Sequence, residues 1–442
     1  MIDFCPQPFQ YQSQKDRVRG ARSFRVLGRV TQVVGLVVEA NGPNARVGDV
    51  CWIESAGGES IDAEVVGFRG DRVLLMPLGE MHGVRAGDLV HTNGRCLEVP
   101  VGPMLLGRAL DGLGRPMDGL GPISGADRYP VLATPPNALD RQMIQFPYGT
   151  GVRAIDGLLT MGIGQRIGIF AGSGVGKSTL LGMIARNGQA DVNVIALIGE
   201  RGREVREFIE NDLGEEGMKR SVLICATSDE PALVRIKAAL AATSVCEYFR
   251  DQGLNVMLMM DSVTRFAMAQ REVGLAVGEP PSTRGYTPSV FAMLPRLMER
   301  AGCGPRGAIT AIYTVLVDGD DNNEPIADAA RSILDGHIVL SRKLTSKGHY
   351  PPIDTSQSLS RVMPFVTPAD HIQKANRLRE LMSAYRDVED LVSIGAYKQG
   401  TKPDADEALA KWSKIETFLR QDKAQATEYP ETLNQLKELI DA

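Results

Sequence analysis

The residues with the clearest chemical potential form a glycine-rich loop that ends in a lysine and a serine. The run 171–178 fits the phosphate-binding loop pattern, with alanine in place of the first glycine. Glycines allow backbone N–H groups to surround a phosphate, and the N-terminus of a following helix adds partial positive charge. We expect ATP to contact the loop and the start of that helix, namely Gly172, Ser173, Gly174, Val175, Gly176, Lys177, Ser178 and Thr179. Lys177 would reach the β- and γ-phosphates, and Ser178 would ligate Mg²⁺.

Two carboxylates stand where apolar runs end. Asp261 follows the run 255–260, and Glu200 follows the run 192–198. In a parallel sheet, the carboxyl ends of the strands meet at the edge that binds ligands. Asp261 is then a second magnesium residue, and Glu200 is a base or water-positioning residue. Each acid also stands where it could cap the next helix. A P-loop in the same sheet favours the metal role for Asp261, whereas position alone leaves both roles open for Glu200.

The elements that position these residues alternate between apolar runs and helical patterns. The apolar runs are 166–170, 192–198, 222–226, 256–260 and 309–317. Strands separated by helices of this length predict a mostly parallel, doubly wound α/β sheet. The P-loop lies directly after the first of these runs and before a helical stretch, which is the context that the motif requires.

The regions on either side of this sheet follow different patterns. Residues 23–101 are Val-rich and alternate in polarity, which predicts a β-barrel, with two similar Gly-Asp turns at 46–50 and 85–89. The stretch 102–136 is rich in Gly and Pro, so neither a helix nor a central strand is expected there. Beyond residue 368 helical spacing predominates. We therefore predict four parts, an N-terminal segment at 1–22, a barrel domain at 23–101, a nucleotide domain at 102–366 and a helical domain at 367–442.

The helical domain carries two apolar stripes. These are Leu409, Trp412, Ile415 and Leu419 on one helix, and Leu433, Leu436 and Ile440 on the next. We interpret both stripes as core, and binding of a partner is the alternative.

Bulk properties exclude several classes of protein. The net charge of −5 gives no support for nucleic-acid binding. The six cysteines (Cys5, Cys51, Cys96, Cys225, Cys246 and Cys303) include no C-x-x-C pair, so we expect reduced thiols rather than a zinc or redox centre. Neither a membrane-spanning apolar run nor a signal segment is found in the sequence. We expect a cytoplasmic protein that visits a membrane only peripherally.

The order of the motifs resembles the α/β-type subunits of rotary ATPases. The P-loop is followed by Gly199, Glu200 and Arg201, then by the strand with Asp261, then by the run 352–360, which matches that superfamily's signature. The resemblance covers nearly the whole chain. It implies a RecA-like P-loop nucleotide domain with an N-terminal β-barrel and a C-terminal helical domain, active as a ring of six.

The resemblance also assigns roles to single residues. Glu200 is the implied catalytic carboxylate, whereas Lys177, Arg201 and Asp261 support the phosphates and the metal. Tyr350 would stack on adenine. Arg361 matches the arginine that reaches the γ-phosphate in a neighbouring subunit, for which a surface salt bridge is the alternative.

Within the superfamily, the chain is most similar to the type III export ATPases. The similarity is carried by the runs 249–253, 261–272 and 278–281, and the run 284–291 is similar to the flagellar branch. The helical domain lacks the acidic element that synthase β subunits carry. The segment before the barrel is short, which leaves the usual docking helix for the export regulator poorly defined.

This resemblance implies an ATP hydrolase that drives export of flagellar proteins as a homohexamer. The implied partners are further copies of the chain, regulator and stalk proteins of the export apparatus, and export substrates with their chaperones. It also implies peripheral association with the export gate at the inner membrane face. The alternatives are a virulence-injectisome ATPase, a rotary synthase subunit and a hexameric RNA translocase. The last would need a basic, aromatic-bearing surface, and the barrel region shows no such pattern.

Overall fold

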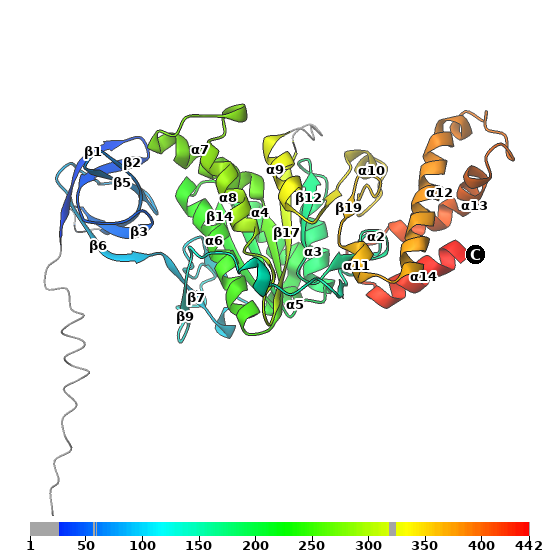
Figure 1. Ribbon diagram of the computed structural model, residues 1–442, viewed down its shortest axis with the longest axis horizontal. Coiled ribbons are helices and arrows are strands. Elements are labelled where there is room, and N and C mark those ends of the chain that lie inside the picture. The colour runs from blue at the N-terminus through cyan, green and yellow to red at the C-terminus, as the bar shows by residue number, and fades with distance from the viewer. Residues whose placement is uncertain (1–25, 56–57, 59, 318–323, 442) are drawn as a thin grey trace, which may run out of the picture. The chain divides into compact units, whose positions relative to one another are not determined.

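The computed structural model describes residues 26–55, 58, 60–317 and 324–441 (Figure 1). The predicted N-terminal segment at 1–22 lies outside the described residues. The chain divides into two compact units, of which the first ends at Arg95 and the second begins at Cys96.

The first unit is a closed β-barrel, as the alternating sequence predicts. Within the described residues its order is β1-β2-β5-β4-β3-β6. The strands are β1 (Gly28–Val34), β2 (Val37–Asn41), β3 (Asp49–Glu54), β4 (Ser60–Arg69), β5 (Arg72–Pro77) and β6 (Leu89–Cys96). One side chain of each alternating pair points inward, so that residues such as Val38, Ile53 and Leu75 form a buried core.

The two Gly-Asp turns of the barrel share one geometry. Gly48 and Gly87 have positive φ angles of 91° and 94°. The carboxylate of Asp49 accepts a hydrogen bond from Arg46 N at 2.9 Å, and that of Asp88 accepts one from Arg85 N at 2.7 Å. Each turn thus pairs a glycine in the left-handed region with an Asp that satisfies a backbone donor.

The second unit is built on a mostly parallel sheet of nine strands among the described residues. The order is β19-β18-β12-β17-β15-β13-β14-β8, and β16 pairs with β17. These strands are β8 (Ala109–Asp111), β12 (Arg166–Ala171), β13 (Val192–Glu200), β14 (Ser221–Thr227), β15 (Asn255–Asp261), β16 (Gly302–Cys303), β17 (Ala308–Leu316), β18 (Gly336–Val339) and β19 (Leu359–Ser360). The five predicted strands are all present, and their ends differ from the predicted ends by no more than two residues.

The Gly- and Pro-rich stretch holds no central strand. Its strand β8 lies at the edge of the sheet, and β9 (Asp127–Pro130) pairs with β7 (Glu98–Val101) outside the sheet. A further short pair is formed by β10 (Pro147–Tyr148) and β11 (Met161–Gly162). The short 3₁₀ turns are η1 (Pro103–Leu105), η2 (Ala138–Asp140) and η4 (Thr283–Gly285).

Helices pack against this sheet and fix the elements that carry the functional residues. They are α2 (Arg153–Leu158), α3 (Lys177–Asn187), α4 (Gly202–Glu207), the π-helical η3 (Phe208–Leu213), α5 (Gly214–Lys219), α6 (Ala232–Asp251), α7 (Val263–Val277), α8 (Pro288–Met298), α9 (Pro325–Ile333), α10 (Arg342–Ser346) and α11 (Met363–Val366). Helix α6 packs on β13, β14 and β15 and on α7, while α3 packs on η3 and α5.

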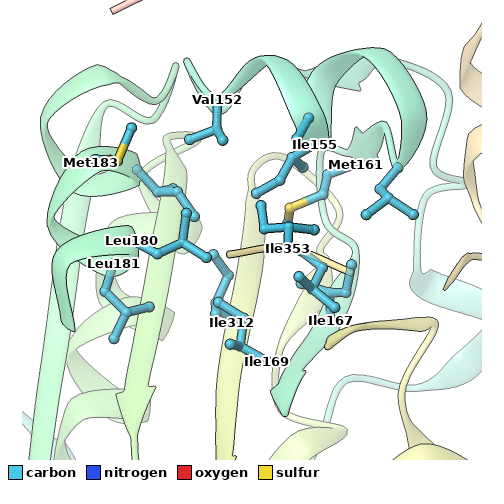
Figure 2. Close-up of a cluster of buried hydrophobic side chains, with 14 of the residues drawn as sticks. Val152, Ile155, Met161, Ile167, Ile169, Leu180, Leu181, Met183, Ile312 and Ile353 are labelled. Atoms are coloured by element: carbon cyan, nitrogen blue, oxygen red, sulfur yellow. The ribbon is translucent and has the colours of Figure 1, made fainter. Parts of the chain in front are cut away.

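The core beneath the P-loop holds both of its ends. Figure 2 shows Leu180, Leu181 and Met183 of α3 in one cluster of buried side chains with Ile169 of β12 and Ile312 of β17. All of these side chains are at most 2% exposed. Burial of each such side chain contributes roughly 1.5–3 kcal/mol to folding. The loop between β12 and α3 is therefore anchored at both ends to elements that are packed into the core.

Three helices form the C-terminal part (Figure 1), as the helical spacing predicts. They are α12 (Ala369–Ser393), α13 (Pro403–Leu419) and α14 (Tyr429–Asp441), and they pack on one another and on α2. Ile415, Leu419 and Leu436 of the apolar stripes are buried in the core, and Trp412 stacks on Tyr385 with 3.5 Å between ring centroids. The interpretation of the stripes as core holds for these residues. Among the described residues, none of the helices combines the length and apolarity that crossing a membrane requires.

Candidate nucleotide site

The P-loop has the backbone shape of an anion cradle. Gly174 and Gly176 have φ angles of 75° and 97°, which a residue with a Cβ rarely adopts. Gly176 caps α3, so the loop ends at the N-terminus of a helix. The N–H groups of residues 173–176 donate no hydrogen bond to any part of the chain that the structure describes. Unused donors at a helix N-terminus form a site for a phosphate group.

Helix α10 and the segment around Pro352 contact the loop. The guanidinium of Arg342 on α10 donates to Ser173 O at 3.3 Å, and Thr345 Oγ1 donates to Val175 O at 3.5 Å. Pro352 lies beside Gly176, since a Cβ built on that glycine would be 3.9 Å from the proline ring. The sequence analysis missed Arg342 and Thr345, because no local motif marks them.

Lys177 brings the two predicted carboxylates together. Its Nζ pairs closely with Asp261 Oδ1 at the end of β15 and lies 3.6 Å from Glu200 Oε1 at the end of β13. These strands are neighbours in the sheet. Asp261 is 2% exposed, and its Oδ1 also accepts a hydrogen bond from Thr314 Oγ1 at 2.8 Å. A lysine and two acids from distant parts of the sequence thus meet at one edge of the sheet.

The structure does not place either carboxylate as a helix cap. Ser262, rather than Asp261, caps α7, because its side chain accepts a hydrogen bond from Arg265 N. The residue at the cap position of α4 is Arg201, and no side chain caps that helix. The capping alternatives for Asp261 and Glu200 therefore find no support in the geometry.

The charges at this edge are strongly coupled. Burial opposes the charge on Lys177, but the neighbouring Asp261 and Glu200 raise its pKa, so the ammonium stays protonated. Burial, together with the charge of Asp261, raises the pKa of Glu200 to about 7. Glu204 on α4 adds to this shift, since it shares a hydrogen bond with Glu200 that lowers the pKa of Glu204. Glu200 is thus a carboxyl group that titrates near neutral pH.

The side chains at this edge fit a magnesium ion bound together with a phosphate. Mg²⁺ in nucleotide sites commonly takes one or two protein oxygens and completes its shell with substrate phosphates and water. The hydroxyl of Ser178, next to Lys177 on α3, and the carboxylate of Asp261 offer this kind of donor. Among the described residues there is no group of three or more His, Cys, Asp or Glu side chains that would hold a metal without a substrate.

Two predicted residues of the site make other contacts. Arg201 is an exposed side chain and pairs with Glu204 Oε1 at 3.3 Å rather than with Lys177 or Asp261. The hydroxyl of Thr179 hydrogen-bonds the carboxylate of Asp212 on η3. Neither contact lies within the group around Lys177.

Arg265 is a further cation near this group that the sequence analysis did not single out. A Cβ built on Gly199 would lie 3.0 Å from Arg265 Cβ, which places this side chain directly beside the residue that precedes Glu200. Its Nε is buried and has no hydrogen-bond partner among the described residues. Arg265 is one of two arginines on α7, the other being Arg271, and no local motif marks it as a site residue.

Arg361 and Tyr350 lie on the segments that follow β18. Arg361 N donates to Asp335 O at 3.0 Å, but the exposed guanidinium of Arg361 makes no hydrogen bond or ion pair with the part of the chain that the structure describes. The side chain of Tyr350 is 49% exposed, and two residues later Pro352 lies against the P-loop. Tyr350 therefore lies two residues before a proline that is beside the P-loop, and Arg361 presents an unpaired charge.

Comparison with protein families matches most of the described chain in three parts. Residues 151–360 match the nucleotide-binding domain of the ATP synthase alpha/beta family, and residues 30–94 match the β-barrel domain of that family. Residues 367–438 match the C-terminal domain of the type III secretion ATPase EscN. The three matches occur in the order barrel, nucleotide domain and helical domain.

Individual relatives cover the chain almost from end to end. A flagellum-specific ATP synthase of Bacillus subtilis is 55% identical over 412 residues, which is 93% of this chain and 94% of that protein. A type 3 secretion system ATPase of Xanthomonas euvesicatoria is 54% identical over 418 residues, with 94% and 95% covered. The solved structure of the assembled ATPase EscN of enteropathogenic E. coli is 48% identical and superposes with a TM-score of 0.88, covering 93% of this chain and all of that one.

Proposed function

The chain belongs to the ATP synthase α/β family, among the flagellum-specific ATP synthases and type 3 secretion system ATPases, and on this basis we propose that it hydrolyses ATP to drive export of flagellar proteins. The residues proposed for the site are those of the P-loop with Glu200, Arg201, Asp261, Tyr350 and Arg361.

One observation carries the proposal of the active site. Lys177 lies between Glu200 and Asp261, at the ends of neighbouring strands and next to a loop with unused N–H donors. The loop N–H groups and Lys177 bind the phosphates, and Ser178 and Asp261 hold Mg²⁺. When bound, the ion supplies positive charge that neutralises the phosphate oxygens. Glu200 orients and polarises the attacking water, for which its carboxylate must be ionised.

The first test of this function is Lys177→Ala in the purified chain. We expect the wild-type protein to hydrolyse ATP. The variant should lose hydrolysis, because it lacks the ammonium that faces the phosphates, although the loop backbone persists. Thermal melting should stay cooperative, since the loop is held by the core of β12 and α3. Lys219→Ala is the matched control, because Lys219 is exposed and pairs with Glu216. Normal turnover by a cooperatively melting Lys177→Ala protein would refute the assignment.

The raised pKa of Glu200 predicts a pH dependence of kcat/KM, which reports ionisations of the free enzyme. Protonated Glu200 cannot act as a base, so kcat/KM for ATP should fall as the pH drops below about 7. Because Glu204 contributes to the raised pKa, Glu204→Gln should move the midpoint of this profile to lower pH. The terminal phosphate of ATP titrates at about pH 6, but that ionisation belongs to the substrate and is the same for wild type and for Glu204→Gln. Identical midpoints for wild type and Glu204→Gln would argue against Glu200 as the titrating group.

The assembly that we propose is a homohexamer with a neighbouring chain completing each site. The unpaired Arg361 supports this proposal, and the EscN relatives are described as assembled and as bound to the central stalk EscO. By analogy we propose contacts with stalk and regulator proteins, with export substrates and chaperones, and with the export gate at the cytoplasmic face of the inner membrane. Light scattering of the purified chain with nucleotide, read against its ATPase activity, tests whether the ring forms without a second kind of subunit.

A virulence injectisome is the second candidate for the pathway served. The injectisome-type relative from Xanthomonas is 54% identical, one percentage point below the Bacillus flagellar protein. The run 284–291 supports the flagellar branch. Deletion of the gene decides between them, because loss of flagellar filaments and swimming supports the first function, whereas normal swimming with loss of injected effectors supports the second.

A further inference from the structure

One buried glutamine of the C-terminal region is hydrogen-bonded to the segments that surround the nucleotide site. Gln421 lies in the connection between α13 and α14 and is 4% exposed. Its Oε1 accepts a hydrogen bond from Arg153 N at 2.9 Å, and its Nε2 donates to Gly151 O at 2.7 Å and to Gln425 O at 2.8 Å. The backbone N of Gln421 donates to Tyr350 O at 2.9 Å.

The partners of this side chain require a primary amide. One is a backbone N–H, which donates, and two are carbonyl oxygens, which accept. A carboxylate of the same shape would satisfy the N–H of Arg153 but would place negative charge against two oxygen atoms. Buried acceptors that lose their donors destabilise the folded chain. The network thus requires the hydrogen-bonding groups of glutamine, whereas packing alone would accept a glutamate of the same shape.

Two arginines fix the rest of the same connection. The guanidinium of Arg153 donates to Phe418 O at 2.8 Å and to Thr427 Oγ1 at 3.3 Å, and it pairs closely with Arg420 O. Arg186, at the far end of the P-loop helix, donates to Lys423 O at 2.6 Å. The segment 420–427 is therefore tied to both α2 and α3.

Tyr350 is held from two sides as a result. On one side Pro352 lies beside the P-loop glycine Gly176, and Pro352 O accepts a hydrogen bond from Ser341 N at 2.8 Å. On the other side the carbonyl of Tyr350 is bound by Gln421 N. The backbone of Tyr350 is therefore fixed, whereas its half-exposed ring remains accessible to a ligand.

We propose that Gln421 is a positioning residue for the base of the bound nucleotide. It sets the place of Tyr350 and of the adjoining segment 420–427 relative to the P-loop, so that a purine base meets a preformed wall. This inference rests on the proposed function, because it takes Tyr350 as the stacking residue and the P-loop as the phosphate site. The base is remote from the bond that breaks. Loss of Gln421 should therefore weaken ground-state and transition-state binding alike, which raises KM and leaves kcat unchanged.

The test compares ATP with inorganic tripolyphosphate, which carries the phosphates but no base. In Gln421→Glu, KM and the calorimetric Kd for ATP should rise roughly 5- to 100-fold, the range that loss of a base–aromatic stack gives. The Kd for tripolyphosphate should stay unchanged. Gln373→Glu is the matched control, since it adds the same charge through an exposed side chain on α12, outside the segment 420–427. We expect Gln373→Glu to bind both ligands as wild type does.

Other results would distinguish failure of the positioning role of Gln421 from failure of the proposed ATPase function. If Gln421→Glu fails to melt cooperatively, Gln421→Met removes the hydrogen bonds without adding charge and takes its place. Equal loss of affinity for ATP and tripolyphosphate, or no loss for either, would overturn the positioning role. A fall in kcat with unchanged KM would also overturn it, although the proposed ATPase would stand. Absence of binding of both ligands to the wild-type chain would instead refute the proposed function.

Discussion

Glu200→Gln should bind ATP as the wild type does and hydrolyse it roughly 10² to 10⁴ times more slowly, the usual contribution of a general acid or base. The amide keeps the shape of the side chain and its hydrogen-bonding capacity but cannot accept a proton from water. Lys177 keeps its close partner Asp261 in this variant, so the phosphate-binding ammonium stays in place. The measurement is kcat under saturating ATP, together with the Kd of ATP in the absence of turnover.

Glu207→Gln provides the control for this substitution. Glu207 lies on α4 near Glu200 in sequence, is exposed, and pairs with Arg203 at 2.6 Å. Its neutralisation removes one negative charge from α4, the helix that follows Glu200, without touching Lys177. If Glu200→Gln keeps more than about a tenth of the wild-type kcat, it costs less than 1.4 kcal/mol on the barrier, and Glu200 is not the catalytic base.

The parallel sheet and the P-loop were predictable because their signals are local. The five apolar runs are five to nine residues long and alternate with helical patterns, which is typical of strands in an α/β fold, and the loop motif specifies its own flanking elements. The two Gly-Asp turns of the barrel were predictable for the same reason. Gly48 and Gly87 need positive φ angles, and Asp49 and Asp88 bind the backbone donor three residues earlier.

The composition of the site was less predictable, since its contacts join residues that are far apart in the sequence. Lys177 and Asp261 are 84 residues apart, and the hydroxyl of Thr314 that binds Asp261 is 53 residues further on. The local sequence pattern fits a helix cap at Glu200 as well as a catalytic role. Only the geometry of α4, in which Arg201 occupies the cap position, argues against the cap. Gln421 has no sequence signal, because the hydrogen bonds of its side chain go to three backbone groups that the fold brings within reach.

Arg361→Ala should bind ATP almost normally and hydrolyse it roughly 10³ to 10⁵ times more slowly. An arginine supplied by a neighbouring subunit has an effect of this size, because it neutralises charge on the transferring phosphoryl group. The structure supports such a role in one respect. The backbone of Arg361 is held by Asp335 O and by the preceding β19, while its guanidinium is exposed and unpaired among the described residues. Arg386→Ala is the control, because Arg386 contacts Asp354 in the signature run 352–360 that precedes Arg361.

Mixing two inactive variants tests whether Arg361 acts across subunits. Lys177→Ala and Arg361→Ala are each expected to be inactive alone, but a mixed ring contains some interfaces in which an intact P-loop faces an intact Arg361. Partial recovery of ATPase activity on mixing is therefore the expected result, with co-assembly checked by light scattering. Mixtures that assemble but stay inactive would mean that Arg361 serves its own subunit or that the ring needs every site intact. Arg361→Ala that is fully active by itself would exclude the role altogether, because every subunit of that ring lacks the arginine.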